Sequence, residues 1–215
     1  MKLTIGIIFC DKDKHYYNRL INEIEENVIG EKEVIVYDNT STLLEDIGVK
    51  VIGQNKHNDR QLKARIEISK VATGDYIWFV DGDDFVGITD IERIYRSHKT
   101  AIIHFSVMTK HEWKTEFKTK EEIVLTRKCY DKIGPVLWSK WIKTEIYKKA
   151  YNEIESYGLV EEVSCSEDII GTLACMKYSK TISGCNTFIL KQNIEDSYTG
   201  RNEKLPSEGF IAVSK

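Results

Sequence analysis

The sequence has little proline, few cysteines and no long apolar run. Only two of its 215 residues are proline, whereas 41% are hydrophobic and 30% are charged. A chain with this hydrophobic share and a net charge of only −3 is not disordered, because it has enough apolar surface to offset the entropy lost on ordering. Its length suits one domain, since single cores stop growing near roughly 250 to 300 residues. We therefore expect one folded domain.

The missing patterns exclude several classes of protein. No apolar stretch reaches the roughly 20 residues that a membrane-spanning helix requires. The near-neutral charge disfavours a nucleic-acid binder, and the absence of a Gly-x-Gly-x-x-Gly motif, a P-loop and a Ser or Cys nucleophile motif disfavours hydride transfer and ATP hydrolysis. The scattered cysteines form no Cys-x-x-Cys pair, a pattern typical of free thiols in a reducing compartment; they are Cys10, Cys129, Cys165, Cys175 and Cys185.

Short apolar strands alternate with amphipathic helices in the first hundred residues. The pattern predicts strands and helices in the order 3–9 (strand), 15–28 (helix), 34–37 (strand), 49–52 (strand), 58–71 (helix) and 76–80 (strand). The first strand is continuously apolar, as expected of a parallel strand that is covered on both faces. Alternation of this kind predicts an α/β fold, in which helices flank both faces of a mixed, mostly parallel sheet.

The second half of the chain is less regular. Thr89-x-x-Glu92 reads as a capping box that starts a helix reaching about residue 98. The remaining predicted elements are, in order, a strand (101–108), a hairpin or exposed loop (111–120), a helix (126–133), a strand (136–142), a helix (144–154), a helix capped by Ser166 (167–178) and a strand (187–190). We expect the tail from Ser197 onward to be mobile.

The strongest local feature is the acidic segment Asp81-Gly82-Asp83-Asp84, which follows an apolar strand. Three carboxylates within four positions repel one another unless a cation lies between them. Carboxylate oxygens select Mg²⁺ or Mn²⁺, and two such ligands leave coordination positions for water and a phosphate-bearing substrate. The alternative is an ordinary acidic turn in which Asp83 or Asp84 caps the following segment.

Two further acidic positions carry a functional and a structural interpretation each. Asp38 ends the second strand, where its carboxylate can accept a hydrogen bond from uracil or from a ribose hydroxyl, or can form an Asx turn. Glu167 and Asp168 begin a predicted helix, where the helix dipole favours acids whatever their function. A carboxylate there can also serve as the general base that deprotonates an acceptor hydroxyl.

The segment Trp138-Ser139-Lys140-Trp141 places two indole rings beside a cation. Sugars stack on indole rings, but on a strand these tryptophans would lie on opposite faces, so at least one must pack in the core. Core packing is the interpretation that physical arguments favour.

In this order, the motifs resemble those of bacterial glycosyltransferases of family 2, which have the Rossmann-like GT-A fold. The resemblance covers roughly residues 3 to 199, and its most specific part runs from the Gly-Asp-Tyr-Ile motif to the acidic segment. The residues that carry it are Asp38, Ala64-Arg65, Gly74-Asp75-Tyr76-Ile77, Phe79-Val80-Asp81-Gly82-Asp83-Asp84, Trp138-Ser139-Lys140, Glu167-Asp168 and Ser197-Tyr198-Thr199.

The resemblance implies a role for each matching site residue. Asp38 and Arg65 would bind the nucleotide-sugar donor, a UDP-sugar. Asp81 and Asp83 would form the Asp-x-Asp element that holds Mn²⁺ or Mg²⁺ together with the diphosphate. Asp168 would be the catalytic base of an inverting transfer, with Glu167 as its neighbour.

The resemblance also implies partners and a division of the chain. The acceptor would be a glycan or a lipid-linked hydroxyl in surface polysaccharide assembly, and the protein would be cytoplasmic, at the inner face of the membrane. Residues 1–100 would form the nucleotide-sugar-binding half of the domain, residues 101–200 the acceptor-binding half and residues 201–215 a mobile tail.

Four departures from the family pattern touch the donor side. Cys10-Asp11-Lys12-Asp13 replaces the usual Pro-Thr-Tyr-Asn, Asn39 stands where a second Asp is common, Arg60 replaces a Gly and Ile66 replaces an Asn. These changes point to an altered base or sugar preference, or to weakened catalysis.

Three alternative functions remain open from the sequence. A nucleotidyltransferase on a related sheet would need a basic, glycine-rich loop after the first strand, where this chain has a half-acidic one. A non-catalytic module would keep the nucleotide pocket without turnover. A transferase acting on modified DNA bases is disfavoured by the near-neutral charge.

Overall fold

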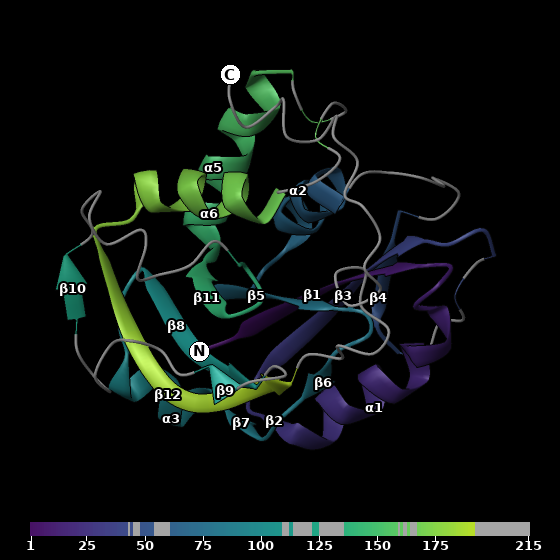
Figure 1. Cartoon of the computed structure of the whole chain (residues 1–215), viewed down its shortest axis with the longest axis horizontal. Coiled ribbons are helices and arrows are strands. Elements are labelled where there is room, and N and C mark those ends of the chain that lie inside the picture. Colours follow the sequence, from purple (N-terminus) through teal and green to yellow (C-terminus); the bar gives the residue numbers. More distant parts are fainter. Residues whose placement is uncertain are drawn as a thin grey trace.

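A central sheet with helices on both faces forms the body of the protein (Figure 1). The computed structural model describes residues 1–42, 44, 48–53, 61–108, 112–113, 122–124, 136–158, 160, 163 and 167–191. The longer strands are β1 (Leu3–Cys10), β3 (Lys32–Asn39), β4 (Lys50–Ile52), β5 (Tyr76–Asp81), β8 (Ile102–Met108), β11 (Lys140–Lys143) and β12 (Thr181–Lys191). The short strands are β2 (Val28–Ile29), β6 (Phe85–Val86), β7 (Thr89–Asp90), β9 (Glu112–Trp113) and β10 (Glu122–Val124). The helices are η1 (Lys14–Tyr16), α1 (Tyr17–Asn27), α2 (Gln61–Val71), α3 (Ile91–Ser97), α5 (Thr144–Ser156) and α6 (Glu167–Tyr178).

In the part of the chain that the structure describes, ten strands form one sheet with the main order β10-β12-β8-β11-β5-β1-β3-β4. Parallel pairs join β1 to β3 and β5, β3 to β4, and β8 to β12, whereas β11 runs antiparallel to both β5 and β8. The sheet is therefore mixed and mostly parallel, which confirms the predicted α/β class. The strand order reverses at β1, and in open sheets of this kind ligands bind at the carboxyl ends of the strands beside such a reversal.

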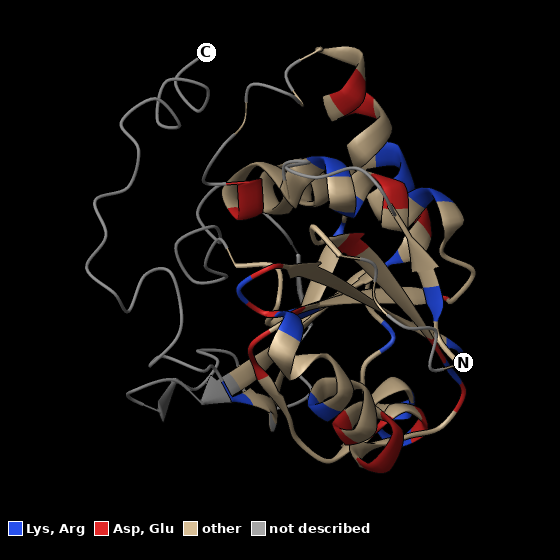
Figure 2. Ribbon diagram, turned by 90° about the vertical axis from the view of Figure 1, so that its right-hand side faces the viewer, with Lys and Arg blue, Asp and Glu red and all other residues tan. Residues whose placement is uncertain are grey.

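Two apolar cores hold the helices to the sheet. On one face, α1 and α3 pack through residues such as Leu20, Ile24 and Ile91. On the other face, α2, α5 and α6 pack through residues such as Ile68 and Tyr147. Figures 1 and 2 show these two groups of helices on opposite sides of the sheet.

The side chains of β5 alternate between the two cores. Tyr76, Trp78 and Val80 belong to the core under α1 and α3, whereas Ile77 and Phe79 belong to the core under α2, α5 and α6. Because side chains on a strand alternate with a period of two, Asp81 follows Ile77 and Phe79 onto the α2 face. This alternation decides which residues surround its carboxylate.

The predicted capping box at Thr89 is wrong. Thr89 belongs to β7, and the N-cap of α3 is Asp90, whose carboxylate accepts a hydrogen bond from the backbone nitrogen of Arg93 at 3.0 Å. Glu92 does not reach back to the helix start, because it binds the N-terminal ammonium group of Met1 at 2.7 Å. A contact between residues far apart in the sequence thus takes the place of the local hydrogen bond that a capping box requires.

β3 extends two residues beyond each end of the strand predicted over 34–37, and two strands of the second half differ more in extent. The strand predicted over 136–142 is β11, which covers only Lys140–Lys143; the preceding residues turn through the core, where the backbone nitrogen of Lys140 donates to the carbonyl of Leu137. The strand predicted over 187–190 is β12, which begins at Thr181 because it pairs with β8 and β10.

Other predictions lie wholly or partly outside the described residues. These are the helix over 126–133, the start of the helix predicted over 58–71, the cap at Ser166 and the tail from Ser197. Of the segment 111–120, predicted as a hairpin or an exposed loop, only Glu112–Trp113 is described; it pairs antiparallel with the end of β8. Among the helices that the structure describes, none combines the length and apolar character needed to span a bilayer.

Candidate functional site

The polar ends of three neighbouring strands meet at one edge of the sheet. The register places Asp38 opposite Phe9 and Asp81 opposite Ile8, so β1 lies between the two carboxylate-bearing strands. Two strand spacings amount to about 10 Å. Asp38 and Asp81 therefore both lie at the carboxyl edge, on either side of the point where the strand order reverses.

Three acidic side chains surround the guanidinium group of Arg65, which α2 contributes and which is only 3% exposed. Its Nη1 donates to Oδ1 of Asp168 and, at 3.2 Å, to Oε1 of Glu167, both at the start of α6. Its Nη2 lies 3.9 Å from Oδ1 of Asp81. The structure therefore brings together four of the predicted site residues from β5, α2 and α6.

The electrostatics of this cluster favour a retained positive charge. Burial opposes ionisation of Arg65, but the carboxylates of Asp168 and Glu167 outweigh it and raise the pKa of Arg65. Burial raises the pKa of both Asp81 and Glu167, and Arg65 opposes the shift in each case while the neighbouring Asp168 reinforces it. One arginine faces three carboxyl groups, so the cluster carries excess negative charge when all three are ionised.

Asp83 lies beyond the end of β5 and faces different neighbours. Asp83 is 9% exposed, and burial together with the charge of Asp13 raises the pKa of its carboxyl group. The backbone nitrogen of Asp84 donates to the carbonyl of Asp81 at 3.2 Å, which closes a turn. Asp81 and Asp83 therefore flank one turn but lie in different surroundings.

Asp38 is 1% exposed and organises the loop that follows β3. Its Oδ1 accepts hydrogen bonds from the backbone nitrogen and hydroxyl of Thr40, and its Oδ2 accepts one from the backbone nitrogen of Leu44. This is the Asx-turn arrangement that the sequence allowed. A carboxylate has about four acceptor sites, so these contacts leave capacity for a ligand.

Trp138 and Lys140 are both buried, as core packing predicts. The carbonyl of Trp138 accepts a hydrogen bond from the indole nitrogen of Trp78 at 2.8 Å. The ammonium group of Lys140 donates to the carbonyl of Val136 at 2.6 Å and to the hydroxyl of Ser139 at 3.1 Å. Burial lowers the pKa of Lys140 to about 7, and the charge of Asp168 opposes this shift.

The donor set of the acidic residues suits a hard divalent cation. Within the described ranges, no group of three or more His, Cys, Asp or Glu side chains is arranged to hold a metal ion by itself. Asp81 and Asp83 nevertheless supply two carboxylates, and burial, which raises the pKa of each, makes their ionised forms costly without a further cation. Oxygen ligands of this kind fit Mg²⁺ or Mn²⁺ whose remaining positions are filled by phosphate and water.

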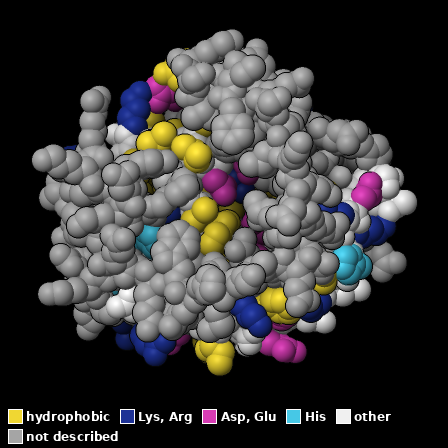
Figure 3. Space-filling model, viewed as in Figure 1, with side chains coloured by type: hydrophobic (Ala, Val, Ile, Leu, Met, Phe, Trp, Pro, Cys, Tyr) yellow, Lys and Arg dark blue, Asp and Glu magenta, His cyan; other side chains and the backbone are white. Residues whose placement is uncertain are grey.

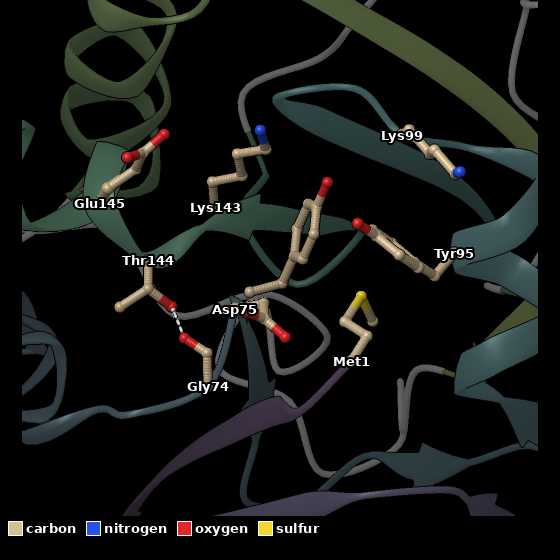
Figure 4. Close-up of a pocket in the computed structure, with 9 residues that line it drawn as sticks. Met1, Gly74, Asp75, Tyr95, Lys99, Lys143, Thr144 and Glu145 are labelled. Atoms are coloured by element: carbon tan, nitrogen blue, oxygen red, sulfur yellow. Dashed lines mark hydrogen bonds between the residues drawn. The ribbon is translucent and has the colours of Figure 1, made fainter.

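A cavity of about 540 Å³ lies at the opposite edge of the sheet (Figure 4). The cavity lies at the beginning of β5, where Tyr76 pairs with Lys143 of β11. Both residues line it, together with Tyr95, Lys99 and Glu145. It contains none of the predicted site residues. Figure 3 shows a place near the centre of its face where acidic and basic side chains gather beside apolar ones.

Pattern reasoning missed the contribution of α1 to the acidic turn. The side chains of Arg19 and Glu23 lie on the polar side of the helix predicted over 15–28, yet they are only 27% and 22% exposed. Nη2 of Arg19 donates to the carbonyls of Asp83 and Asp84 at 2.9 and 2.7 Å. The only available signal was the four-residue spacing of polar residues on one side of the helix.

Comparison with known proteins gives a family and a set of related folds. The profile described as Glycosyl transferase family 2 matches residues 4–156, whereas a search of curated proteins found no match. Among solved structures, S. aureus TarS 1–349 in complex with UDP-GlcNAc aligns with a TM-score of 0.75 and 18% identity over 99% of this chain and 64% of that chain.

Two further TarS structures align in the same way. TarS 1–349 in complex with UDP gives a TM-score of 0.69 and 19% identity over 96% of this chain and 67% of that chain. Another structure of S. aureus TarS gives 0.68 and 18% over 96% and 41%, respectively. At these identities the likeness establishes the shared fold, and this chain spans less than two thirds of the first of these structures.

Proposed function

Because this chain belongs to glycosyl transferase family 2 and has the GT-A fold, we propose that it is an inverting glycosyltransferase that uses a UDP-sugar donor. The observation that carries the proposal is the cluster of Asp81, Glu167 and Asp168 around Arg65, at the edge where the strand order reverses. The choice of uridine is supported by TarS, which is similar in fold and was solved with UDP and UDP-GlcNAc.

The donor and the acceptor meet at this cluster in the proposed reaction. Asp38 contacts the nucleoside, and Asp81 and Asp83 face the diphosphate. Asp168 lies on the acceptor side because α6 belongs to the second half of the chain, with Glu167 beside it. A hydroxyl of a glycan or a lipid-linked sugar in surface polysaccharide assembly is the acceptor that the family resemblance supports.

The proposed transfer is a single displacement in which each carboxylate has one role. Asp168 accepts the proton of the acceptor hydroxyl, whose oxygen then forms a bond to the anomeric carbon while the bond from that carbon to the diphosphate oxygen breaks. A divalent ion held by Asp81 and Asp83 would neutralise charge on the leaving diphosphate. One displacement inverts the anomeric configuration and leaves no covalent intermediate on the protein.

Arg65 takes a different part from the donor contact implied by the resemblance. Its guanidinium group is buried and already bound to Glu167 and Asp168. We assign it to holding Asp168 through Oδ1, so that the second carboxylate oxygen is directed at the acceptor hydroxyl. Arg65 also lies 3.9 Å from Asp81, so it connects Asp168 with the proposed donor side of the site.

Thermal stabilisation by UDP with and without Mn²⁺ tests the donor site. A ligand that binds only the folded state raises the melting temperature, by about 2.7 kcal/mol of stability at 100 times its Kd. We expect a shift with UDP plus Mn²⁺ in the wild type and none in Asp83→Ala. Asp75→Asn, at the other end of β5, is the matched control and keeps the shift.

Turnover separates an enzyme from a non-catalytic module. Asp168→Asn removes the proposed base, and we expect it to bind UDP and Mn²⁺ like the wild type while forming no glycosylated product from a UDP-sugar panel. Equal stabilisation of wild type and Asp83→Ala would contradict the donor site. Binding without product in both the wild type and Asp168→Asn would identify a nucleotide-binding module instead.

A further inference from the structure

Three polar residues of α1 contact the segment that follows Asp81, and they stand four residues apart. Arg19 donates to the carbonyls of Asp83 and Asp84 at 2.9 and 2.7 Å. Glu23 accepts a hydrogen bond from the backbone nitrogen of Val86 at 3.0 Å, and Asn27 donates to the carbonyl of Val86 at 2.8 Å. We call Arg19, Glu23 and Asn27 the α1 ladder.

The helical repeat explains why these three positions act together. Residues four apart lie one above the other on one side of a helix and advance by about 6 Å. Two strand residues cover roughly the same length. The ladder therefore runs alongside residues 83–86, while Leu20 and Ile24 bury the neighbouring side of α1 in the core.

Ring contacts restrict the guanidinium group of Arg19. It lies 4.5 Å from the ring centroid of Tyr16 and 4.0 Å from that of Phe85, and its Nε is 3.8 Å from Glu23. Aromatic faces attract cations, most strongly where water is excluded. The group that binds the two carbonyls is therefore held from three directions.

The other side of the same segment is bound by the end of the chain's last described strand. Phe85 and Val86 form β6, which pairs with Lys191 and Leu190 of β12, and the backbone nitrogen of Gly87 donates to Ile189 at 2.9 Å. The acidic turn is thus followed by a segment held between α1 and β12. Asp83 itself receives its backbone orientation from Arg19 on the α1 side.

We propose that the α1 ladder positions Asp83 for the metal–diphosphate complex, with Arg19 as the principal positioning residue. The ladder acts through the backbone of residues 83–86 and touches neither substrate nor metal. This inference rests on the proposed function, because it assumes that Asp83 contributes to nucleotide binding. Outer residues that orient ligands typically change metal affinity about 10- to 100-fold when they are removed.

Two matched pairs of variants test the ladder by calorimetric titration of UDP in the presence of Mn²⁺. We expect Arg19→Ala and Glu23→Ala to weaken binding about tenfold or more. The exposed residues Arg93 of α3 and Glu26 of α1 provide the controls, and their alanine variants should bind like the wild type. Arg19→Lys keeps the charge but not the planar fork, so its affinity should fall between those of Arg19→Ala and the wild type.

Hydrogen exchange of the protein without ligands gives a readout that does not depend on binding. In Glu23→Ala the amide of Val86 loses its acceptor, so it should exchange faster than in the wild type and in Glu26→Ala. If Arg19→Ala does not fold, Arg19→Lys and Glu23→Ala carry the test.

Wild-type protein that shows no Mn²⁺-dependent UDP binding overturns the proposed function and this inference with it. Wild-type affinity in the folded ladder variants, beside a wild type that binds, overturns this inference alone.

Discussion

The guanidinium group of Arg65 illustrates how much one buried residue depends on its partners. It lies among carboxylates that are 16, 102 and 103 residues away in the sequence: Asp81, Glu167 and Asp168. Removing one partner of a buried ion pair is costly because the remaining charge is left uncompensated, whereas replacing both partners can be neutral. Arg65 therefore supports the fold as well as the site.

Replacement of Arg65 by Met should destabilise the protein strongly. Met preserves much of the volume but leaves the carboxylates without their cation, so we expect a loss of about 3–5 kcal/mol in the free energy of unfolding. Urea denaturation measures it. Arg93→Met, at an exposed arginine of α3, should stay within about 0.5 kcal/mol of the wild type. Equal midpoints for the two variants would contradict the structural role of Arg65.

A second residue-scale prediction concerns the acid stability conferred by Glu33. Partial burial opposes its ionisation, but hydrogen bonds from Thr4, Thr73 and Lys2 outweigh burial and lower the pKa of Glu33 to about 2. A carboxyl group with a lowered folded-state pKa stabilises the protein above its unfolded pKa of 4.5 and loses that effect as pH falls towards 2.

Glu33→Gln should therefore be less stable than the wild type at pH 7, by about 1.5–3 kcal/mol for hydrogen bonds to a charged group. The difference should shrink between pH 4.5 and pH 2 as the wild-type carboxylate takes up a proton. Urea midpoints of both proteins at pH 7, 5 and 3 provide the measurement. A difference that does not change with pH would show that the charge of Glu33 is unimportant.

At the scale of the element, the entry to β5 depends on a close approach of two backbone segments. The backbone nitrogen of Gly74 donates to the hydroxyl of Thr4 at 3.0 Å. A Cβ atom at Gly74 would lie 2.6 Å from the backbone nitrogen of Thr4 and 2.9 Å from the carbonyl of Lys2. Glycine is needed here for space, whereas Gly158 after α5 is needed for its φ of +70°.

The two glycines should respond differently to alanine. Gly74→Ala forces β1 and β5 apart, so we expect a loss of about 3 kcal/mol or more. Gly158→Ala meets nothing within 4 Å and should lose only about 1 kcal/mol, the cost of a left-handed conformation for a residue with a Cβ atom. Melting temperatures should fall by about 6–12 °C and 2–4 °C, respectively. A smaller loss for Gly74→Ala would mean that the strands move apart easily.

For the whole molecule, the order of strands decides where chemistry can occur. β1 lies between β3 and β5, which brings the ends of strands from two βα units to one edge. β11 then reverses direction beside β5, and α5 and α6 follow it over the α2 face. Asp168 reaches the carboxyl end of β5 by this route, although it lies in the half of the chain where the sequence pattern is weakest.

The strand and helix pattern of the first hundred residues was predictable because each element there carries its own signal. The continuous apolar run of β1 and the period of α1 are local properties. The elements of the second half were harder to predict, because buried residues such as Leu137 and Trp138 lie in a turn but have the apolar pattern of a strand. Burial of a loop cannot be recognised from hydrophobicity alone.

The acidic residues of the site were also predictable, but their partners were not. Asp81 and Asp83 stand out because like charges cluster after an apolar strand, and Asp168 because its motif resembles that of a known family. Arg19 carries no comparable signal, since polar residues at helical spacing are typical of any exposed surface. Its contacts with Asp83 and Asp84 appear only when α1 is packed on the sheet.

The sequence by itself determined the fold class, the order of the elements and the identity of the acidic residues at the strand ends, because periodicity and charge clustering act over a few residues. Only the tertiary structure decided that Arg65 binds Asp168 and that Asp38 closes its own turn while α1 holds the backbone of Asp83. The long-range pairings depend on how helices pack over a sheet, and the turn at Asp38 was one of two local outcomes that the sequence left open.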